Sequence, residues 1–255
     1  MTNTDIQRFA REELLPRLGG DYALFSRRDA VRLRGSFAQS VLLGSKRSGN
    51  LLVIPTFYVV GARPDDECMH QTLSLPVSGM DTARKWHVRP DQALDAALAQ
   101  HLIGQMEKDS PLSFVAPLDD AGLDRCLGIY LKKTDQWIPA LSRAFLSMCR
   151  GLPQARAELD AARRIFLVTS RFGLGGTPVD WENAALARFD ELASRLERDD
   201  CIALCRADAE AHAQRMRLPA LPWPAAWPAA VPPWPAPAQA GGFQRLVQRL
   251  RGAPG

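Results

Sequence analysis

The densest run of reactive side chains in this 255-residue chain is Asp65-Asp66-Glu67-Cys68-Met69-His70. A cysteine thiol becomes a nucleophile when a histidine accepts its proton, and loops after strands often carry such residues. Cys68 and His70 are only two residues apart, however, and side chains at that spacing on an extended segment point the same way without touching. We therefore favour a solvated acidic loop at Asp65–His70, with an enzyme active site as the alternative.

A second candidate is the glycine-rich run Gly173-Leu174-Gly175-Gly176, which precedes a strong helix-start signal at Thr177-Pro178. Glycine backbone next to a helix N-terminus can hold an anion such as a phosphate group. The run lacks the lysine of a nucleotide-binding loop. We expect a flexible connector at Gly173–Gly176, with a dispersed active site near this loop and Asp65–His70 as the alternative.

Cys201, Cys205 and His212 fall on one expected helix, where thiols four residues apart share a face. A zinc site needs a fourth ligand, and the paired-knuckle spacing that makes such predictions strong is missing. Cysteines on the buried stripe of a helix are more common. We expect no metal and no cofactor here, we assign no catalytic residue, and we expect His87 and His101 to be structural.

The net charge of +4 suggests an anionic partner until it is divided along the chain. Residues 219–255 carry +3, so the remainder carries only +1 and offers little of the charge neutralisation on which nucleic-acid binding depends. One local run, Arg27 to Arg47, is basic, and a nucleic-acid-associated protein is a third hypothesis that rests on it. The alternative is the solvated face of an antiparallel sheet. The candidate anion-binding residues are Arg32, Arg34, Lys46 and Arg47.

Residues 218–244 contain no charged side chain and are long enough to cross a bilayer. Eight prolines in this stretch remove backbone donors that lipid cannot replace, which excludes a membrane-spanning helix. Trp-Pro pairs at Trp223, Trp227 and Trp234 lie in a stretch that is typical of polyproline II, a semi-rigid arm. Tryptophan suits interfaces because its large ring fills a pocket with few rotamers lost.

After Gly241-Gly242, four apolar residues recur at i, i+3, i+4 and i+7, which is the pattern of a short amphipathic helix over residues 243–251. So short a helix needs a surface to fold against, because nucleation is unfavourable. The surface is the protein's own body, the groove of a partner protein or, least favoured, an anionic membrane. The predicted partner-binding residues are Trp223, Trp227, Trp234, Phe243, Arg245, Leu246, Val247, Arg249 and Leu250.

The elements that position these residues begin with a helix over residues 4–18, with Thr4 and Gln7 as its capping box and Gly19 at its end. Residues 29–77 have a composition that is typical of strands, which we expect at residues 31–34, 37–43, 51–60 and 73–77. In the first of them Val31 and Leu33 alternate with arginines, as in a half-buried strand. Pro55 indicates an edge strand or a bulge, because proline donates no ladder hydrogen bond.

Helical spacing dominates after Pro90. Thr177 is the expected cap of the clearest helix, whose buried stripe begins at Ala185, and Ile165–Val168 fits a helix or a buried strand equally well. The expected helices are Asp91–Lys108, Asp119–Lys133, Trp137–Arg150, Gln154–Ser170, one that starts at Thr177, and Cys201–Arg217.

Strands that cluster early and helices that follow predict an α+β fold, with an N-terminal helix and an antiparallel meander before a helical half. We expect one body over residues 1–218, β-rich over 21–89 and helical over 90–218. A Pro/Trp-rich linker over 219–242 and a docking helix over 243–251 complete the domain prediction.

Five irregularly spaced cysteines indicate reduced thiols, and charged residues interrupt any apolar signal sequence near the N-terminus, so we expect a cytoplasmic protein. The tail favours a non-enzymatic adaptor that binds another protein; we do not expect nucleic acid or a membrane as partners. The residue usage is typical of GC-rich bacterial genomes, which suggests an accessory component of a secretion, immunity or defence complex.

Overall fold

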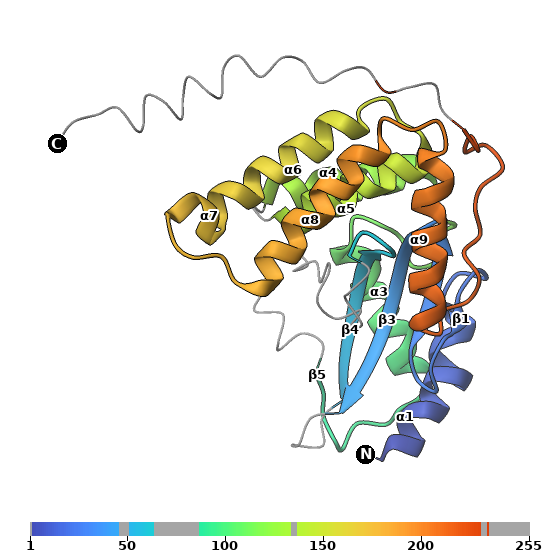
Figure 1. Cartoon of the computed structure of the whole chain (residues 1–255). Helices are drawn as coiled ribbons and strands as arrows, with labels where there is room; N and C mark the ends of the chain where they lie inside the picture. The colour runs from blue at the N-terminus through green and yellow to red at the C-terminus, as the bar shows by residue number, and fades with distance from the viewer. Residues whose placement is uncertain (1, 46–50, 64–86, 134–136, 231–233, 235–255) are drawn as a thin grey trace.

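The computed structural model describes residues 2–45, 51–63, 87–133, 137–230 and 234 (Figure 1). The fold is α+β, as predicted: a helical N-terminal segment, an antiparallel sheet and then a helical half. Several predictions lie outside the described residues: the Asp65–His70 loop, the strand at 73–77, Lys46, Arg47 and the helix at 243–251.

The N-terminal helical segment consists of α1 (Asn3–Phe9), a π-helical turn (Ala10–Leu14) and a 3-10 turn (Leu15–Arg17). The predicted capping box of Thr4 and Gln7 is wrong by two residues. The Thr2 hydroxyl accepts from the Asp5 N–H at 3.2 Å, and the Asp5 carboxylate accepts from the Thr2 N–H at 2.8 Å. The helix cap therefore lies two residues before the predicted one, at Thr2 instead of Thr4.

The sheet is a meander of five antiparallel strands in chain order: β1 (Ala23–Leu24), β2 (Ala30–Arg34), β3 (Phe37–Ser45), β4 (Leu51–Val59) and β5 (His87–Val88). Pro55 of β4 pairs with Val41 of β3. On the other side of β4, β5 pairs only with Leu51 and Leu52. Among the described strands, Pro55 therefore faces no neighbour on that side, in keeping with its missing donor.

The helical half contains α3 (Ala96–Asp109), α4 (Asp120–Lys133), α5 (Trp137–Arg150), α6 (Ala155–Thr169), α7 (Arg171–Leu174), α8 (Asp180–Arg195) and α9 (Cys201–Arg215). Ile165–Val168 lies in α6 and is helical. Two predicted starts are wrong: α3 begins after Asp95, whose carboxylate accepts from the Leu98 N–H at 2.9 Å, and α8 begins at Asp180 instead of next to Thr177.

Helix α5 is the centre of the helical half. Nearly all of its residues from Pro139 to Arg150 are buried, and it contacts β4, α4, α6 and α9. In Figure 1, α6 and α8 lie on the outer side of α5, while α9 crosses in front of the sheet. This arrangement leaves the N-terminal ends of α5 and α8 near the end of β4. No helix in the described ranges is long and apolar enough to cross a membrane.

Candidate interaction surfaces

The chain after α9 folds back onto the body. Arg217 has a left-handed backbone (φ 57°), and residues 218–230 then run back along α9 toward its start, ending at Trp234 (Figure 1). We call residues 218–230 together with Trp234 the strap. Several hydrogen bonds hold its backbone to the body: the Leu218 N–H donates to the Ala213 carbonyl at 2.9 Å, the Gly35 N–H donates to the Pro222 carbonyl at 3.0 Å, and the Arg206 side chain donates to the Pro228 carbonyl at 2.8 Å.

Trp227 is a buried anchor of the strap, and it is only 6% exposed. Its indole N–H donates to Asp120 at 3.3 Å, and the Arg150 guanidinium lies 5.8 Å from the ring centroid. One wall is Gly35, in a left-handed conformation (φ +53°), where a Cβ would lie 2.2 Å from the ring. The socket therefore requires glycine at this turn, for both its conformation and its lack of a side chain.

The other two tryptophans of the strap also dock on the body. The Trp223 indole N–H donates to Glu210 at 2.7 Å, and Arg206 lies 5.0 Å from its ring centroid. Trp234 is also buried, and only 6% of it is exposed. Docking on the body is the alternative that the sequence left open for the tail. Partner binding by these three rings stays a prediction.

A second aromatic group reaches the surface at the N-terminal turn of α8. Trp181 is 57% exposed and stacks on Trp137 of α5, with ring centroids 6.4 Å apart and planes 9° apart. Trp137 in turn packs edge-on against the buried Phe166 at 5.1 Å and against Phe189 at 6.0 Å. Trp181 is thus the exposed end of an aromatic cluster that starts in the core.

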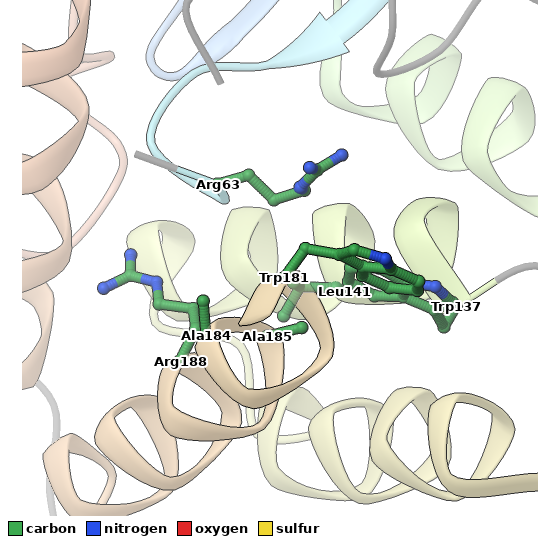
Figure 2. A pocket seen from close by; sticks show the side chains of 7 residues that line it. All are labelled: Arg63, Trp137, Leu141, Trp181, Ala184, Ala185 and Arg188. Atoms are coloured by element: carbon green, nitrogen blue, oxygen red, sulfur yellow. The ribbon is translucent and has the colours of Figure 1, made fainter. Parts of the chain in front are cut away.

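The two indoles border a pocket of about 120 Å³ between α5, α8 and the end of β4 (Figure 2). The Arg63 guanidinium lies 5.6 Å from the centroid of the Trp137 ring. Figure 2 shows the guanidinium of Arg188 pointing away from both rings, so its alkyl stem forms that wall. The lining residues are Arg63, Trp137, Leu141, Trp181, Ala184, Ala185 and Arg188.

Arg188 fixes the shape of this pocket. It is buried, donates to the Gly61 carbonyl at 2.8 Å and pairs with Glu191 at 2.6 Å and Asp208 at 2.9 Å. These bonds link Gly61, just after the end of β4, to α8 and α9. Because Arg63 is only two residues further along the chain, they also place Arg63 beside the pocket. Because the charge of Arg188 is already paired, the pocket offers mainly aromatic and alkyl surface.

The sequence reading missed Trp181, although a signal was present. The predicted stripe of α8 begins at Ala185, and Trp181 stands four residues before it on the same face. Extending the apolar stripe of α8 by one turn toward its N-terminus includes Trp181, whose indole lies at the N-terminal end of α5. A large aromatic residue at the open end of a buried stripe is therefore the signal for a surface of this kind.

The anion-binding prediction is wrong for Arg32. Its side chain has no exposed surface, and all three guanidinium nitrogens donate to protein acceptors: Nε to Gln39 at 2.7 Å, Nη1 to the Ala116 carbonyl at 2.6 Å and Nη2 to the Ser113 carbonyl. Both faces of β2 are covered here, whereas the alternating pattern predicted one solvated face. Arg34 pairs with Asp120 at 2.8 Å, next to the Trp227 socket, and anion binding by Arg34 stays a prediction.

The Gly173–Gly176 run forms the end of α7, and it stands ahead of α8, which begins at Asp180. Gly175 has a left-handed backbone (φ 73°) as the C-cap of α7, and the Gly176 N–H donates to the Arg171 carbonyl at 3.0 Å. The side chain of Glu182 accepts from the N–H groups of Arg171 at 2.8 Å and Val179 at 3.0 Å. A carboxylate of the protein itself thus occupies the start of α8, where we had considered a ligand anion.

Cys201 and Cys205 are buried on α9, and His212 is buried two turns further on, where its Nδ1 accepts from the Gly61 N–H at 2.9 Å. The histidine therefore holds the end of β4. Within the ranges that the structure describes, no group of three or more His, Cys, Asp or Glu side chains is arranged to hold a metal ion.

No protein-family model, no curated protein and no solved structure matches the chain.

Proposed function

We propose that this protein is a non-enzymatic interaction component that binds a partner protein through the pocket formed by Trp137 and Trp181. The observation that carries the proposal is the 57% exposure of Trp181. An indole left in water is costly, and covering it with a partner recovers that free energy. Tryptophan and arginine are also the residue types that dominate the energetics of protein interfaces.

The size of the pocket favours a partner side chain over a free ligand. At about 120 Å³ it is smaller than the roughly 300–1,000 Å³ that is usual for small-molecule sites. One apolar or aromatic side chain of a partner fits such a volume. It would stack against the indoles on one side and pack on Leu141 and Ala185 on the other.

The tail supplies a second proposed contact. Eight residues separate Trp234 from Phe243, the first apolar residue of the amphipathic segment 243–251. With Trp234 docked on the body, this segment would leave from a fixed point, as a tether to a complex requires. We keep a cytoplasmic location as part of the proposal, because the four described cysteines are buried free thiols.

The test is affinity capture with mass spectrometry from native lysate, using the full-length protein and two full-length variants. Trp181→Ala removes the exposed indole. Leu246→Asp with Leu250→Asp disrupts the apolar face of the tail segment. We expect a specific partner to be captured by the wild type and to be lost or strongly depleted with Trp181→Ala.

Each variant has a matched control. Val115→Ala truncates another exposed apolar side chain, 50% exposed and outside the pocket lining, and Gln244→Asp with Gln248→Asp adds the same charge on the polar face of the tail segment. Both controls should capture the partner at the wild-type level. Equal capture by Trp181→Ala and Val115→Ala would show that the pocket is not the binding surface.

A further inference from the structure

The strap turns back along α9 through one residue with an unfavourable backbone. Arg217 has φ 57°, the only positive φ among the described residues other than glycine. It follows α9 in a Schellman motif: the Leu218 N–H donates to the Ala213 carbonyl at 2.9 Å, and the Arg217 N–H donates to the Gln214 carbonyl at 3.0 Å. Glycine is usual at this position, because a left-handed backbone brings Cβ too close to the following carbonyl oxygen. Arg217 is therefore a short and strained hinge.

The packing beneath this hinge is loose. A cavity of about 360 Å³ lies between the last turns of α9 and the first residues of the strap, and its lining residues are Glu210, Ala213, Gln214, Leu218, Pro219, Ala220 and Leu221. Atoms that border a cavity lack packing partners on that side and lose the dispersion energy of those contacts. The strap is thus held weakly at its start, next to the strained residue, and more firmly further on by Trp223 and Trp227.

The firm contacts do not depend on which molecule supplies the strap. Both indole N–H groups donate to carboxylates of the body, at 2.7 Å for Trp223 and 3.3 Å for Trp227. The carbonyls of Pro222 and Pro228 accept from donors of the body. All these groups belong to a socket that a strap from a second copy can meet in the same geometry.

The strap also has the composition of a preformed ligand. Four of the twelve residues 219–230 are proline, which fixes φ and leaves little conformational entropy to lose on docking. The Trp227 N–H donates to the Pro224 carbonyl at 2.9 Å, so this turn lies within the strap itself. The segment can therefore move from one socket to another as a unit.

We propose that the strap exchanges between two copies of this chain, so that residues 218–230 of each molecule dock in the socket of the other. When Arg217 takes a right-handed or extended backbone, the chain leaves α9 away from its own socket, and the strain is relieved in both molecules. Short hinges under strain favour exchange of this kind. The dimer keeps the contacts of Trp223 and Trp227, and the entropy of association makes its population depend on concentration.

The exchange goes beyond the proposed function and does not depend on it. None of the residues that line the pocket between Trp137 and Trp181 belongs to the strap or to its hinge. Exchange is therefore tested on purified full-length protein without a partner. Failure of the exchange and failure of partner capture are separate results.

The first experiment varies the hinge and measures the association constant of full-length protein by sedimentation equilibrium, after equilibration at several concentrations. Arg217→Gly removes the strain and should lower the constant about tenfold or more. Arg217→Val adds a β-branched side chain, which is poorly compatible with a left-handed backbone, and should raise it about tenfold or more. Arg217→Gln, the control, loses the charge but keeps Cβ and should match wild type. Equal constants for the glycine and valine variants would refute the exchange.

The second experiment asks whether the strap forms the interface. Gly35→Ala obstructs the socket but keeps the strap, whereas Trp223→Ala with Trp227→Ala removes the anchors but keeps the socket. Neither protein should form the exchanged dimer alone. An equimolar mixture should give a heterodimer in native mass spectrometry, with slower hydrogen exchange across residues 219–230 of the Gly35→Ala chain.

A mixture of folded variants without a heterodimer, or a heterodimer whose residues 219–230 exchange as fast as in the Gly35→Ala protein alone, would overturn the proposal. If either variant fails to fold, the hinge series decides by itself, because the Arg217 side chain is exposed and its replacement leaves the socket intact. A dimer whose association constant is the same in all hinge variants forms through another surface and also refutes the exchange.

Discussion

Replacing Gly35 by alanine should detach the strap from the body. Gly35 holds a left-handed backbone at the turn between β2 and β3, and its missing side chain leaves room for two indoles. An added Cβ would lie 2.2 Å and 2.8 Å from two ring atoms of Trp227 and 2.9 Å from one of Trp223. None of these contacts is tolerable, so the rings must move.

Two terms set the size of the effect. A left-handed backbone costs an alanine roughly 1–2 kcal/mol more than a glycine. Full burial of a tryptophan removes about 150–250 Å² from water, which corresponds to about 4–6 kcal/mol at roughly 25 cal/mol per Å². Because a displaced ring keeps part of its cover, we expect Gly35→Ala to lower the free energy of unfolding by about 3–5 kcal/mol.

Urea unfolding followed by circular dichroism measures this loss, and hydrogen exchange across residues 219–230 localises it. Gly20→Ala is the matched control, because a Cβ at Gly20 meets nothing within 4 Å, and it should change stability by less than about 0.5 kcal/mol. If Gly35→Ala were no more destabilising than Gly20→Ala, with unchanged exchange in the strap, the socket described for Trp227 would be incorrect.

Three further outcomes follow from the same contacts. Burial raises the pKa of Asp120, but hydrogen bonds from Arg34 and Trp227 lower it more, to below its usual 3.8. The stabilising effect of Asp120 is therefore complete above pH 3.8 and is lost as the pH falls through the folded-state pKa, so urea unfolding should show Asp120→Asn converging on wild type in acid. Arg32→Ala leaves buried acceptors unpaired and should cost about 3–5 kcal/mol of stability, whereas Arg34→Ala at a partly exposed pair should cost less than about 1 kcal/mol. Trp181→Ala should lower the melting temperature only slightly, because its stacking contributes roughly 0.5–1.5 kcal/mol; a large loss would make Trp181 a structural residue.

The helices that periodicity predicts best are those that bury one face along their whole length. The bounds of α5 agree with the prediction because its apolar residues recur at helical spacing up to Arg150, next to Gly151. The errors concentrate at helix starts, where Thr2, Asp95 and Glu182 provide side-chain acceptors that the local pattern did not single out. The first residue of a helix depends on which side chain accepts hydrogen bonds from the first backbone N–H groups. Several residues that could do so usually lie within a few positions of each other.

The docked strap could not be predicted in the same way. The sequence identifies Trp223, Trp227 and Trp234 as anchors, but the pocket for each is built from elements far away in the chain. In the sequence, Gly35 can be identified only as a turn residue. Its role as a wall of the Trp227 socket depends on the folded position of Trp227. Arg32 was expected to be solvated for a similar reason, since two of its acceptors, the carbonyls of Ser113 and Ala116, lie in the loop after α3. Long-range complementarity of this kind is not encoded in periodicity.

The most direct test of the account is a calorimetric titration of the captured partner into full-length wild type, Trp181→Ala and Val115→Ala. If the exposed indole is the centre of the interface, Trp181→Ala should bind about thirtyfold more weakly, the equivalent of roughly 2 kcal/mol, and Val115→Ala should bind like wild type. Wild-type affinity in Trp181→Ala would contradict the account and move the interface away from the pocket between α5 and α8.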